Sequence, residues 1–149
     1  MIETIAVPAA RVRPMRAAIL RPGQPPELLV YAGDDARETL HLVALEDGQL
    51  DEVIGIATVL RDPHPREAAD GDWRVRGMAT APGRRRRGIG AALLARCEEH
   101  ALAYGGRRLW CNARLPARGF YERAGWSAQG EVFELDEIGP HVVMSKPLT

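Results

Sequence analysis

The stretch of residues 77–104 constrains this chain more than any other, because it passes from a strand-like segment through a Pro-Gly turn and four consecutive arginines into a helical pattern. Leu94, Cys97, Ala101 and Tyr104 recur at steps of three, four and three, which predicts that they share one helix face. The Gly-Gly pair that follows supplies the left-handed cap expected where a helix ends. The stretch therefore predicts a strand, a glycine-rich turn and a helix in direct succession.

A turn of this kind is suited to binding a polyanion. The N–H groups in the first turn of a helix lack intrahelical partners, and the helix dipole adds positive potential there. Gly88 and Gly90 carry no Cβ, which lets a phosphate approach the backbone closely, and the arginines at positions 84–87 add positive charge. We therefore expect a ligand with several negative charges at this turn, most simply a pyrophosphate.

Two common phosphate-binding motifs are absent from the sequence, namely G-x-x-x-x-G-K-[ST] of P-loop proteins and G-x-G-x-x-G of dinucleotide-binding proteins. Residues 85–90 instead read R-x-x-G-x-G. This pattern resembles the acyl-CoA pyrophosphate loop of the GNAT superfamily of N-acetyltransferases. The alternative interpretation of the turn is a basic, solvated loop in front of a core helix.

Two further stretches carry the same resemblance. Residues 77–82 (GMATAP) are similar to the end of the family's fourth strand, and residues 119–126 (GFYERAGW) are similar to the F-Y-x-x-x-G-F signature of its last helix. The three stretches occur in the family's order, and residues 139–144 resemble small bacterial members whose acceptors are often unassigned. The chain is therefore identified as a member of the GNAT superfamily.

Periodicity and turn signals predict an alternating series of elements along the chain. The strands are expected at residues 2–7, 39–45, 53–60, 73–80, 107–111, 126–135 and 141–146, and the helices at residues 8–20, in the segment ending at 104, and at residues 115–124. Their order is β-α-β-β-β-α-β-α-β-β. The resemblance implies an α/β fold of GNAT type, with a mixed, mostly antiparallel central sheet and helices on both faces. We expect a parallel crossover around the central helix, and a bulge or close ligand approach at Gly77.

The composition is that of an ordinary globular protein, with 149 residues, 46% hydrophobic and 27% charged residues and a formal net charge of zero. This length favours a single domain over residues 1–149. Zero net charge argues against a nucleic-acid partner, and no apolar run approaches the roughly 20 residues of a membrane span. The N-terminal residues lack a secretory pattern, so we expect a cytoplasmic protein. Cys97 and Cys111 have no metal-ligand spacing and are predicted to be buried free thiols, so no metal is expected.

The resemblance implies acetyl-CoA as co-substrate and assigns residues to its binding. In the family, the backbone at the end of the fourth strand pairs with the pantetheine arm and points an N–H at the thioester carbonyl, where it stabilises an oxyanion. The residues expected to bind the cofactor are Met78, Ala79, Thr80, Arg85, Arg86, Arg87, Gly88, Ile89, Gly90, Ala91, Asn112, Phe120 and Tyr121.

The resemblance also implies catalytic residues. Tyr121 would donate a proton to the departing thiolate, because a tyrosine (reference pKa about 10) is neutral where a thiolate (about 8.5) forms. Asn112, expected at a strand end, would bond the pantetheine or the acceptor, or would cap a turn. The fourth strand carries no carboxylate, which favours a base that acts through water; Glu134, Asp136 and His141 are the candidates. A core role for Tyr121 and a structural role for His141 are the alternatives.

These residues together predict an acetyl-CoA-dependent N-acetyltransferase in which a primary amine of a small molecule attacks the thioester directly in a ternary complex. A catalytically inactive acyl-CoA-binding module is the alternative. Arg21, Gln24 and His41 are candidates for lining the acceptor pocket, and Trp73, Trp110 and Trp126 are expected in the core or at its rim. The family often dimerises through its last strands, so a homodimer is compatible with the resemblance. The sequence does not identify the acceptor, the preferred acyl chain or the arginine that binds the 3′-phosphate.

Overall fold

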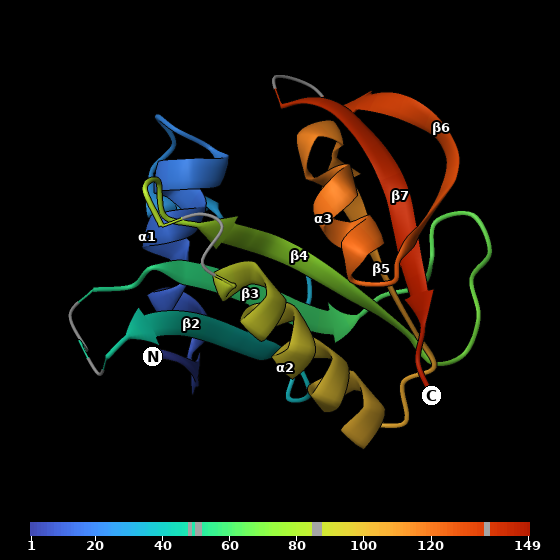
Figure 1. Ribbon diagram of the computed structural model, residues 1–149, viewed down its shortest axis with the longest axis horizontal. Helices are drawn as coiled ribbons and strands as arrows, with labels where there is room; N and C mark the ends of the chain where they lie inside the picture. Colours follow the sequence, from blue (N-terminus) through green and yellow to red (C-terminus); the bar gives the residue numbers. More distant parts are fainter. Residues whose placement is uncertain (48, 50–51, 85–87, 136–137) are drawn as a thin grey trace.

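The computed structural model describes residues 1–47, 49, 52–84, 88–135 and 138–149 (Figure 1). The strands in this part of the chain are β1 (Ile2–Val7), β2 (Leu40–Glu46), β3 (Gly55–Arg61), β4 (Asp72–Thr80), β5 (Arg108–Arg114), β6 (Ser127–Leu135) and β7 (Gly139–Pro147). The helices are α1 (Arg13–Met15), α2 (Ile89–Ala103) and α3 (Arg118–Arg123), with short 3-10 or π segments at η1 (Ala9–Arg11), η2 (Arg16–Leu20), η3 (Pro26–Leu28) and η4 (Leu115–Ala117). No helix within these described ranges is long and apolar enough to cross a membrane.

All of these strands join one sheet in the order β1-β2-β3-β4-β5-β7-β6. Each neighbouring pair is antiparallel except β4 and β5, which are parallel and are connected through α2 (Figure 1). A parallel pair needs a crossover, because the chain must return to the same end of the sheet before the second strand begins. The structure confirms the predicted element order, the mixed sheet and the parallel crossover.

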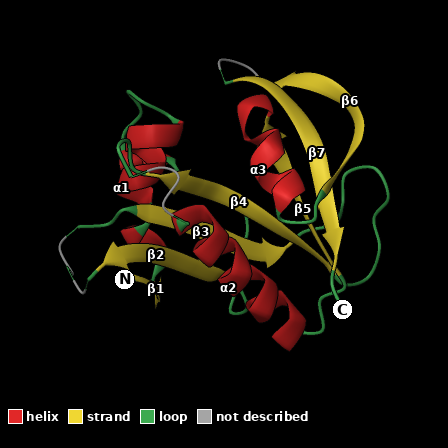
Figure 2. Ribbon diagram, in the orientation of Figure 1, coloured by secondary structure: helices red, strands yellow, loops and turns green. Residues whose placement is uncertain are grey.

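Both faces of the sheet are covered, because successive side chains of a strand point to opposite sides. Leu42, Val59 and Val75 lie in the larger core cluster, on the face that α2 and α3 cover. Val43 and Ile56 lie in a second cluster on the other face, under the first helical segment. Helices on both faces are therefore confirmed (Figure 2).

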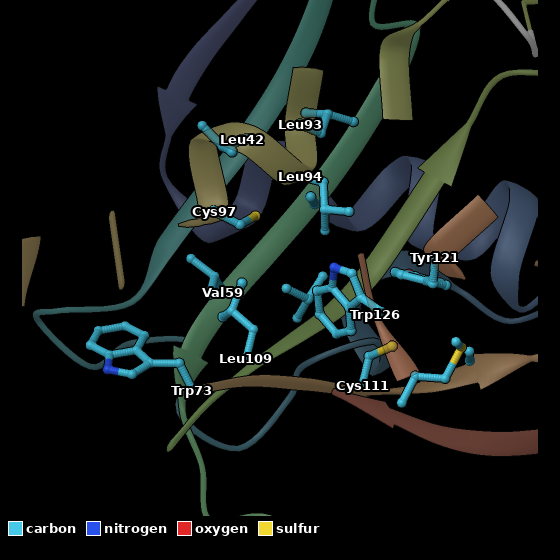
Figure 3. Packing of buried hydrophobic residues seen from close by; sticks show 14 of the residues in the cluster. Leu42, Val59, Trp73, Leu93, Leu94, Cys97, Leu109, Cys111, Tyr121 and Trp126 are labelled. Atoms are coloured by element: carbon cyan, nitrogen blue, oxygen red, sulfur yellow. The ribbon is translucent and has the colours of Figure 1, made fainter. Parts of the chain in front are cut away.

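The larger core cluster is built around α2, and Figure 3 shows its side chains between the helix and the sheet. Trp73, Trp110 and Trp126 are at most 3% exposed, so all three tryptophans are core residues, one of the two predicted settings. Cys97 and Cys111 are buried and free, as predicted. Burial in apolar surroundings raises the pKa of both thiols to about 12, so neither is a ready nucleophile.

The end of α2 follows the predicted glycine cap. Gly105 has a φ of 79°, its N–H donates to the Leu102 carbonyl at 3.0 Å, and the Gly106 N–H donates to the Ala101 carbonyl at 2.7 Å. These two bonds make a Schellman cap. Tyr104, the last of the four residues predicted to share one face, is therefore the C-cap residue; it is 46% exposed, and its ring lies 5.9 Å from that of Trp73.

Three predicted elements differ from the structure. The single helix expected over residues 8–20 is divided into η1, α1 and the π segment η2, in which the Arg21 N–H donates to the Arg16 carbonyl at 3.1 Å. Strand β5 extends to Arg114 because it pairs with β7 as far as Arg114 and His141. Strand β7 begins at Gly139 because its first residues pair with the end of β6, Leu135 with Gly139. Asn112 therefore lies inside a strand and not at its end, and His141 is not the first residue of its strand.

A buried polar network attaches the segment between η2 and β2 to the sheet. The Arg16 guanidinium is fully buried; it donates to both carboxylate oxygens of Asp34 at 2.8 and 3.0 Å and to the Thr58 hydroxyl at 2.9 Å. His41 bonds the same hydroxyl at 2.8 Å and the Asp34 carbonyl oxygen at 2.9 Å. Burial alone would raise the pKa of the Asp34 carboxyl, but the hydrogen bonds from Arg16 and from the Tyr31 N–H outweigh it, and the pKa is lowered.

Replacing Asp34 by Asn should lower the free energy of unfolding at neutral pH by about 3–5 kcal/mol, because it leaves a buried guanidinium without its counter-ion. The folded-state pKa of Asp34 is lowered, so its contribution is present above the unfolded-state pKa and is lost as pH falls through the folded-state value. Urea unfolding should therefore show the difference between wild type and Asp34→Asn narrowing on acidification.

Glu122→Gln is the matched control, because Glu122 forms an exposed pair with Arg118 on α3. That change should alter the unfolding free energy by less than about 1 kcal/mol. If Asp34→Asn proved as stable as Glu122→Gln at neutral pH, the network would not stabilise the fold as argued.

Candidate active site

The candidate site is a cleft where β4 and β5 separate. The parallel ladder joins only Asp72 to Arg74 with Arg108 to Trp110, and the rest of these two fully described strands is not paired with each other. Figure 1 shows β4 and β5 diverging from their common end near the C-terminus. The cleft has a volume of about 190 Å³. Its described lining residues are Leu20, Arg21, Tyr31, Arg74, Val75, Arg76, Gly77, Met78, Cys111, Asn112, Ala113, Arg114, Ala117, Tyr121, Leu135, Ile138 and His141.

A bulge in β4 bends the strand at the cleft. Ile56 pairs with Ala79 and Thr58 pairs with Arg76, so β4 has one residue more than β3 between the two pairs. Gly77 lies in this bulge with a φ of 63°, a left-handed conformation that favours glycine. The predicted bulge at Gly77 is confirmed.

Strand alternation divides the cleft lining between the two faces of the sheet. Val75, Cys111 and Ala113 belong to the core cluster on the α2 and α3 face, as does Tyr121 of α3. The neighbouring residues Arg74, Arg76, Asn112 and Arg114 point to the opposite face, and so does His141, which precedes Val142 of the same cluster. The cleft thus passes through the sheet, with Tyr121 on one side and His141 on the other.

Tyr121 is fixed in α3 with its hydroxyl toward the cleft. The side chain is 7% exposed, and its ring lies 5.1 Å from that of Trp126 (Figure 3). Its hydroxyl lies 3.8 Å from the Met78 sulfur. Burial and the neighbouring Cys111 raise the pKa of the phenol well above its ordinary value, so the hydroxyl stays protonated. Sulfur atoms are weak acceptors, so a stronger acceptor that enters the cleft can take this hydrogen bond.

The turn before α2 has the features of an anion site. Gly88 is the N-cap residue with a φ of 79°, and Ile89 is 2% exposed, which anchors the first turn in the core. A Cβ at Gly90 would lie 3.0 Å from Phe120 Cζ, so the Phe120 ring packs directly against the helix start; Ala91 follows on the exposed side. Arg85, Arg86 and Arg87, which were predicted to bind the cofactor, lie outside the described residues.

Arg84 does not act as an unpaired cation at this turn. Its guanidinium donates to the Glu46 carboxylate and, at 2.7 Å, to the Glu52 carboxylate. Two carboxylates offset its charge, so the prediction that Arg84 adds positive potential to the anion site was wrong. Its role here is to attach the turn to β2 and to the segment that follows β2.

The end of β4 contributes unequally to the cleft. Met78 lines it, whereas Ala79 is buried beside Ile56 and Thr80 pairs with Gly55; neither lines the cleft. Asn112 lines the cleft from the interior of β5. The structure therefore brings Met78 and Asn112 together with Tyr121 in the cleft lining, which does not include Ala79 and Thr80.

Of the candidate bases, His141 lines the cleft, Glu134 is exposed and does not, and Asp136 lies outside the described residues. His141 is buried, and its Nδ1 lies 2.8 Å from the Gly139 carbonyl oxygen. A carbonyl only accepts, so Nδ1 carries the hydrogen, and in the neutral imidazole Nε2 carries the free lone pair.

The three acceptor-pocket candidates lie in different places. Arg21 lines the cleft, while Gln24 is exposed outside it. The prediction that His41 lines the acceptor pocket was wrong, because its side chain is buried in the network with Asp34 and Thr58.

Sequence analysis missed Tyr31, Arg74, Arg76 and Arg114 as lining residues. Arg74 and Arg76 could have been predicted to lie together, because residues two apart on a strand share a face. Arg76 lies over the Tyr31 ring, with its guanidinium carbon 3.8 Å from the ring centroid. Tyr31 comes from the segment before β2, and no local pattern connects it with β4.

Comparison with known proteins agrees with this geometry. The model of the Acetyltransferase (GNAT) family matches residues 10–126. An uncharacterized N-acetyltransferase of Bacillus subtilis, YitI, is 35% identical over 148 residues, which cover 99% of this chain and 97% of that protein. A Lactobacillus plantarum crystal structure superposes with a TM-score of 0.79 at 22% identity, covering 99% of both chains. An aminoglycoside 6′-N-acetyltransferase complexed with coenzyme A superposes with a TM-score of 0.60 at 17% identity, covering 75% of this chain and 74% of that one.

Gly77→Ala should destabilise the protein by about 1–3 kcal/mol, because the left-handed backbone disfavours a Cβ and that Cβ would lie 3.1 Å from the Tyr31 ring and 3.2 Å from Arg16 Nε. Gly83→Ala is the matched control, since Gly83 has a φ of 83° with nothing within 4 Å of a Cβ. Thermal unfolding should show a larger loss for Gly77→Ala. Equal losses would mean that the contacts at the bulge leave room for a methyl group.

Proposed function

The chain belongs to the acetyltransferase (GNAT) family and is an N-acetyltransferase; we propose that it moves the acetyl group of acetyl-CoA to the primary amine of a small molecule, by direct attack in a ternary complex. The observation that supports this most is the cleft through the sheet, which has a protonated Tyr121 on one face and His141 on the other. A donor and an acceptor that enter from opposite faces would meet between β4 and β5. Holding two reactants in line supplies a large part of the rate of such a reaction.

The cofactor would bind along the α2 and α3 side. The family uses acyl-CoA, and its pyrophosphate would accept hydrogen bonds from the first-turn N–H groups at Gly88, Ile89, Gly90 and Ala91. Arg85, Arg86 and Arg87 would add charge there, and Phe120 would fix the start of the helix. The pantetheine arm would run along the free edge of β4 at Met78 into the cleft, where a backbone N–H of residues 78–80 would face the thioester carbonyl.

Tyr121 would act as the general acid. Attack by the amine gives a tetrahedral intermediate, and its collapse breaks the carbon–sulfur bond and leaves a thiolate on CoA. Among the described residues, only sulfur atoms, which are weak acceptors, bond the Tyr121 hydroxyl. The neutral phenol can therefore turn to this thiolate and donate its proton. Its raised pKa keeps the proton available over the neutral range.

His141 would remove the proton that the attacking amine loses, directly or through water. Its Nε2 is the unprotonated nitrogen of the neutral ring, and it lies on the side opposite Tyr121, where the acceptor would enter. Asn112, two strand positions from Arg114 on the same face, would orient the amine or the amide end of the pantetheine.

Tyr121→Phe should lower kcat by about 10²-fold or more, because the thiolate loses its proton donor. Acetyl-CoA-dependent thiol release across a panel of primary amines measures this, and the CoA-induced rise in melting temperature should persist in the variant. Tyr104→Phe is the control, since Tyr104 is exposed at the far end of α2 and should keep full activity. An unchanged kcat in Tyr121→Phe would remove the proposed acid; CoA binding without release for any amine would favour the inactive binding module.

His141→Gln should lower kcat by about 10²–10⁴-fold while leaving the CoA melting shift intact, because glutamine cannot accept the proton. His100→Gln is the matched control: His100 lies on α2 and bonds the Glu38 carbonyl at 2.6 Å, away from the cleft. A fall of the same size in both variants would point to a structural effect of histidine loss instead of base catalysis.

A further inference from the structure

The acceptor side of the cleft carries concentrated positive charge. Four arginines line the cleft, Arg21, Arg74, Arg76 and Arg114, and none of its described lining residues is an aspartate or glutamate. The whole chain has zero formal net charge, so this concentration is local.

Two of these arginines have partners in the protein. Arg74 pairs with Asp62 at 3.2 Å and lies over the Trp110 ring. Arg114 donates to the Leu20 carbonyl at 3.0 Å. These two side chains are held in place by the fold.

Arg76 is different, because it forms no hydrogen bond or ion pair with any described residue. Its guanidinium lies 3.8 Å from the centroid of the Tyr31 ring, and the guanidinium of Arg16 lies at the same distance. Arg16 has Asp34 as its counter-ion, whereas Arg76 has none in the described part of the chain. Burial, with Arg74 and Arg16 as further causes, lowers the pKa of Arg76 to about 10. A partly buried cation without an anion is unfavourable, and a bound anion would relieve this.

Arg21 resembles Arg76 in this respect. It directly follows η2 and lines the cleft, and its side chain likewise has no hydrogen bond or ion pair to a described residue. Arg76 follows Val75 of the core cluster and is therefore on the opposite face, with Asn112 and His141. The bulge at Gly77 shifts the alternation, so Met78 is on the Tyr121 side. The two guanidiniums without a partner in the described part of the chain therefore lie where the acceptor would enter, not where the cofactor would.

Building on the proposed function, we propose that the acceptor is a small primary amine that also carries a carboxylate or phosphate group, and that Arg76 and Arg21 bind this anionic group. A guanidinium presents parallel N–H donors that match two oxygens of either group. The cation–π contact with Tyr31 would orient Arg76 for this pairing. The anion would then fix the amine at one position relative to His141.

The test compares kcat/KM for thiol release between matched acceptors: glycine with glycinamide, leucine with leucinamide, and phosphoethanolamine with ethanolamine. In at least one pair, kcat/KM for the amine that carries the anionic group should exceed kcat/KM for its partner without that group. The expected ratio is about ten- to a hundredfold, the range of a charge-assisted hydrogen bond. Arg76→Gln should remove this preference, and Arg76→Lys should restore part of it. Arg61→Gln, an exposed residue outside the cleft that pairs with Glu38, should keep the preference.

The outcomes separate this inference from the proposed function. Thiol release that is equal or faster with the neutral partner of every pair would overturn the anionic acceptor and leave the acetyltransferase standing. If no amine supports release, the proposed function fails, and melting shifts with CoA present decide the inference. A further shift with an anionic amine that Arg76→Gln loses would support the anion site, and no such shift with any anionic amine would overturn it.

Discussion

The site depends on a sheet that is continuous at one end and open at the other. The parallel ladder between β4 and β5 holds for three residue pairs and then stops, while β3 continues to pair with β4, and β7 with β5. Each strand of the open region therefore keeps one paired edge, and the two free edges face the cleft. Unpaired backbone donors are costly when buried, so an open edge of this kind is stable where water or a ligand can reach it. The same opening allows a ligand on one face of the sheet to meet a ligand on the other.

An opening of this kind needs both halves of the sheet to be held independently. The β1 to β4 half is held by α2 on one face and by the first helical segment on the other. The Arg16 and Asp34 pair adds a polar attachment through Thr58 of β3, and its buried charges leave few alternative arrangements for the segment that carries Tyr31. The β5 to β7 half is held by seven cross-strand pairs between β5 and β7 and by α3, whose Tyr121 ring packs against Trp126, the residue before β6. The position of Tyr31, and with it the orientation of Arg76, thus follows from a buried network whose members Arg16, Asp34 and Thr58 do not line the cleft.

The predictions from sequence were right for features that neighbouring residues in the chain determine. The glycine cap after α2, the bulge at Gly77 and the crossover helix each depend on a few adjacent residues, and all three are present. The predictions were wrong for residues whose position or pairing depends on a partner distant in the sequence. Asn112 was expected at a strand end because the predicted strand stopped at Cys111, but pairing with β7 carries β5 to Arg114. Arg84 reads as part of a basic run, and only the fold brings Glu46 and Glu52 to it. His41 was predicted to line the pocket, but its ring bonds the Asp34 carbonyl oxygen, and Arg16 holds Asp34 in the buried network.

The arrangement of charge also bears on how the amine becomes nucleophilic. An ammonium must lose its proton before it can attack, and nearby positive charge disfavours the ammonium form, which lowers the pKa of the amine. Arg76 and Arg21 lie on the acceptor side, and their guanidiniums pair with none of the described residues. Their charge would act in this direction, so a base of modest strength such as a neutral imidazole would suffice. An acceptor that brings its own anion would tolerate this charge, whereas a simple cationic amine would be repelled on entry. The same arginines would then both select the acceptor and ease its deprotonation, which fits a cleft whose described lining contains no carboxylate.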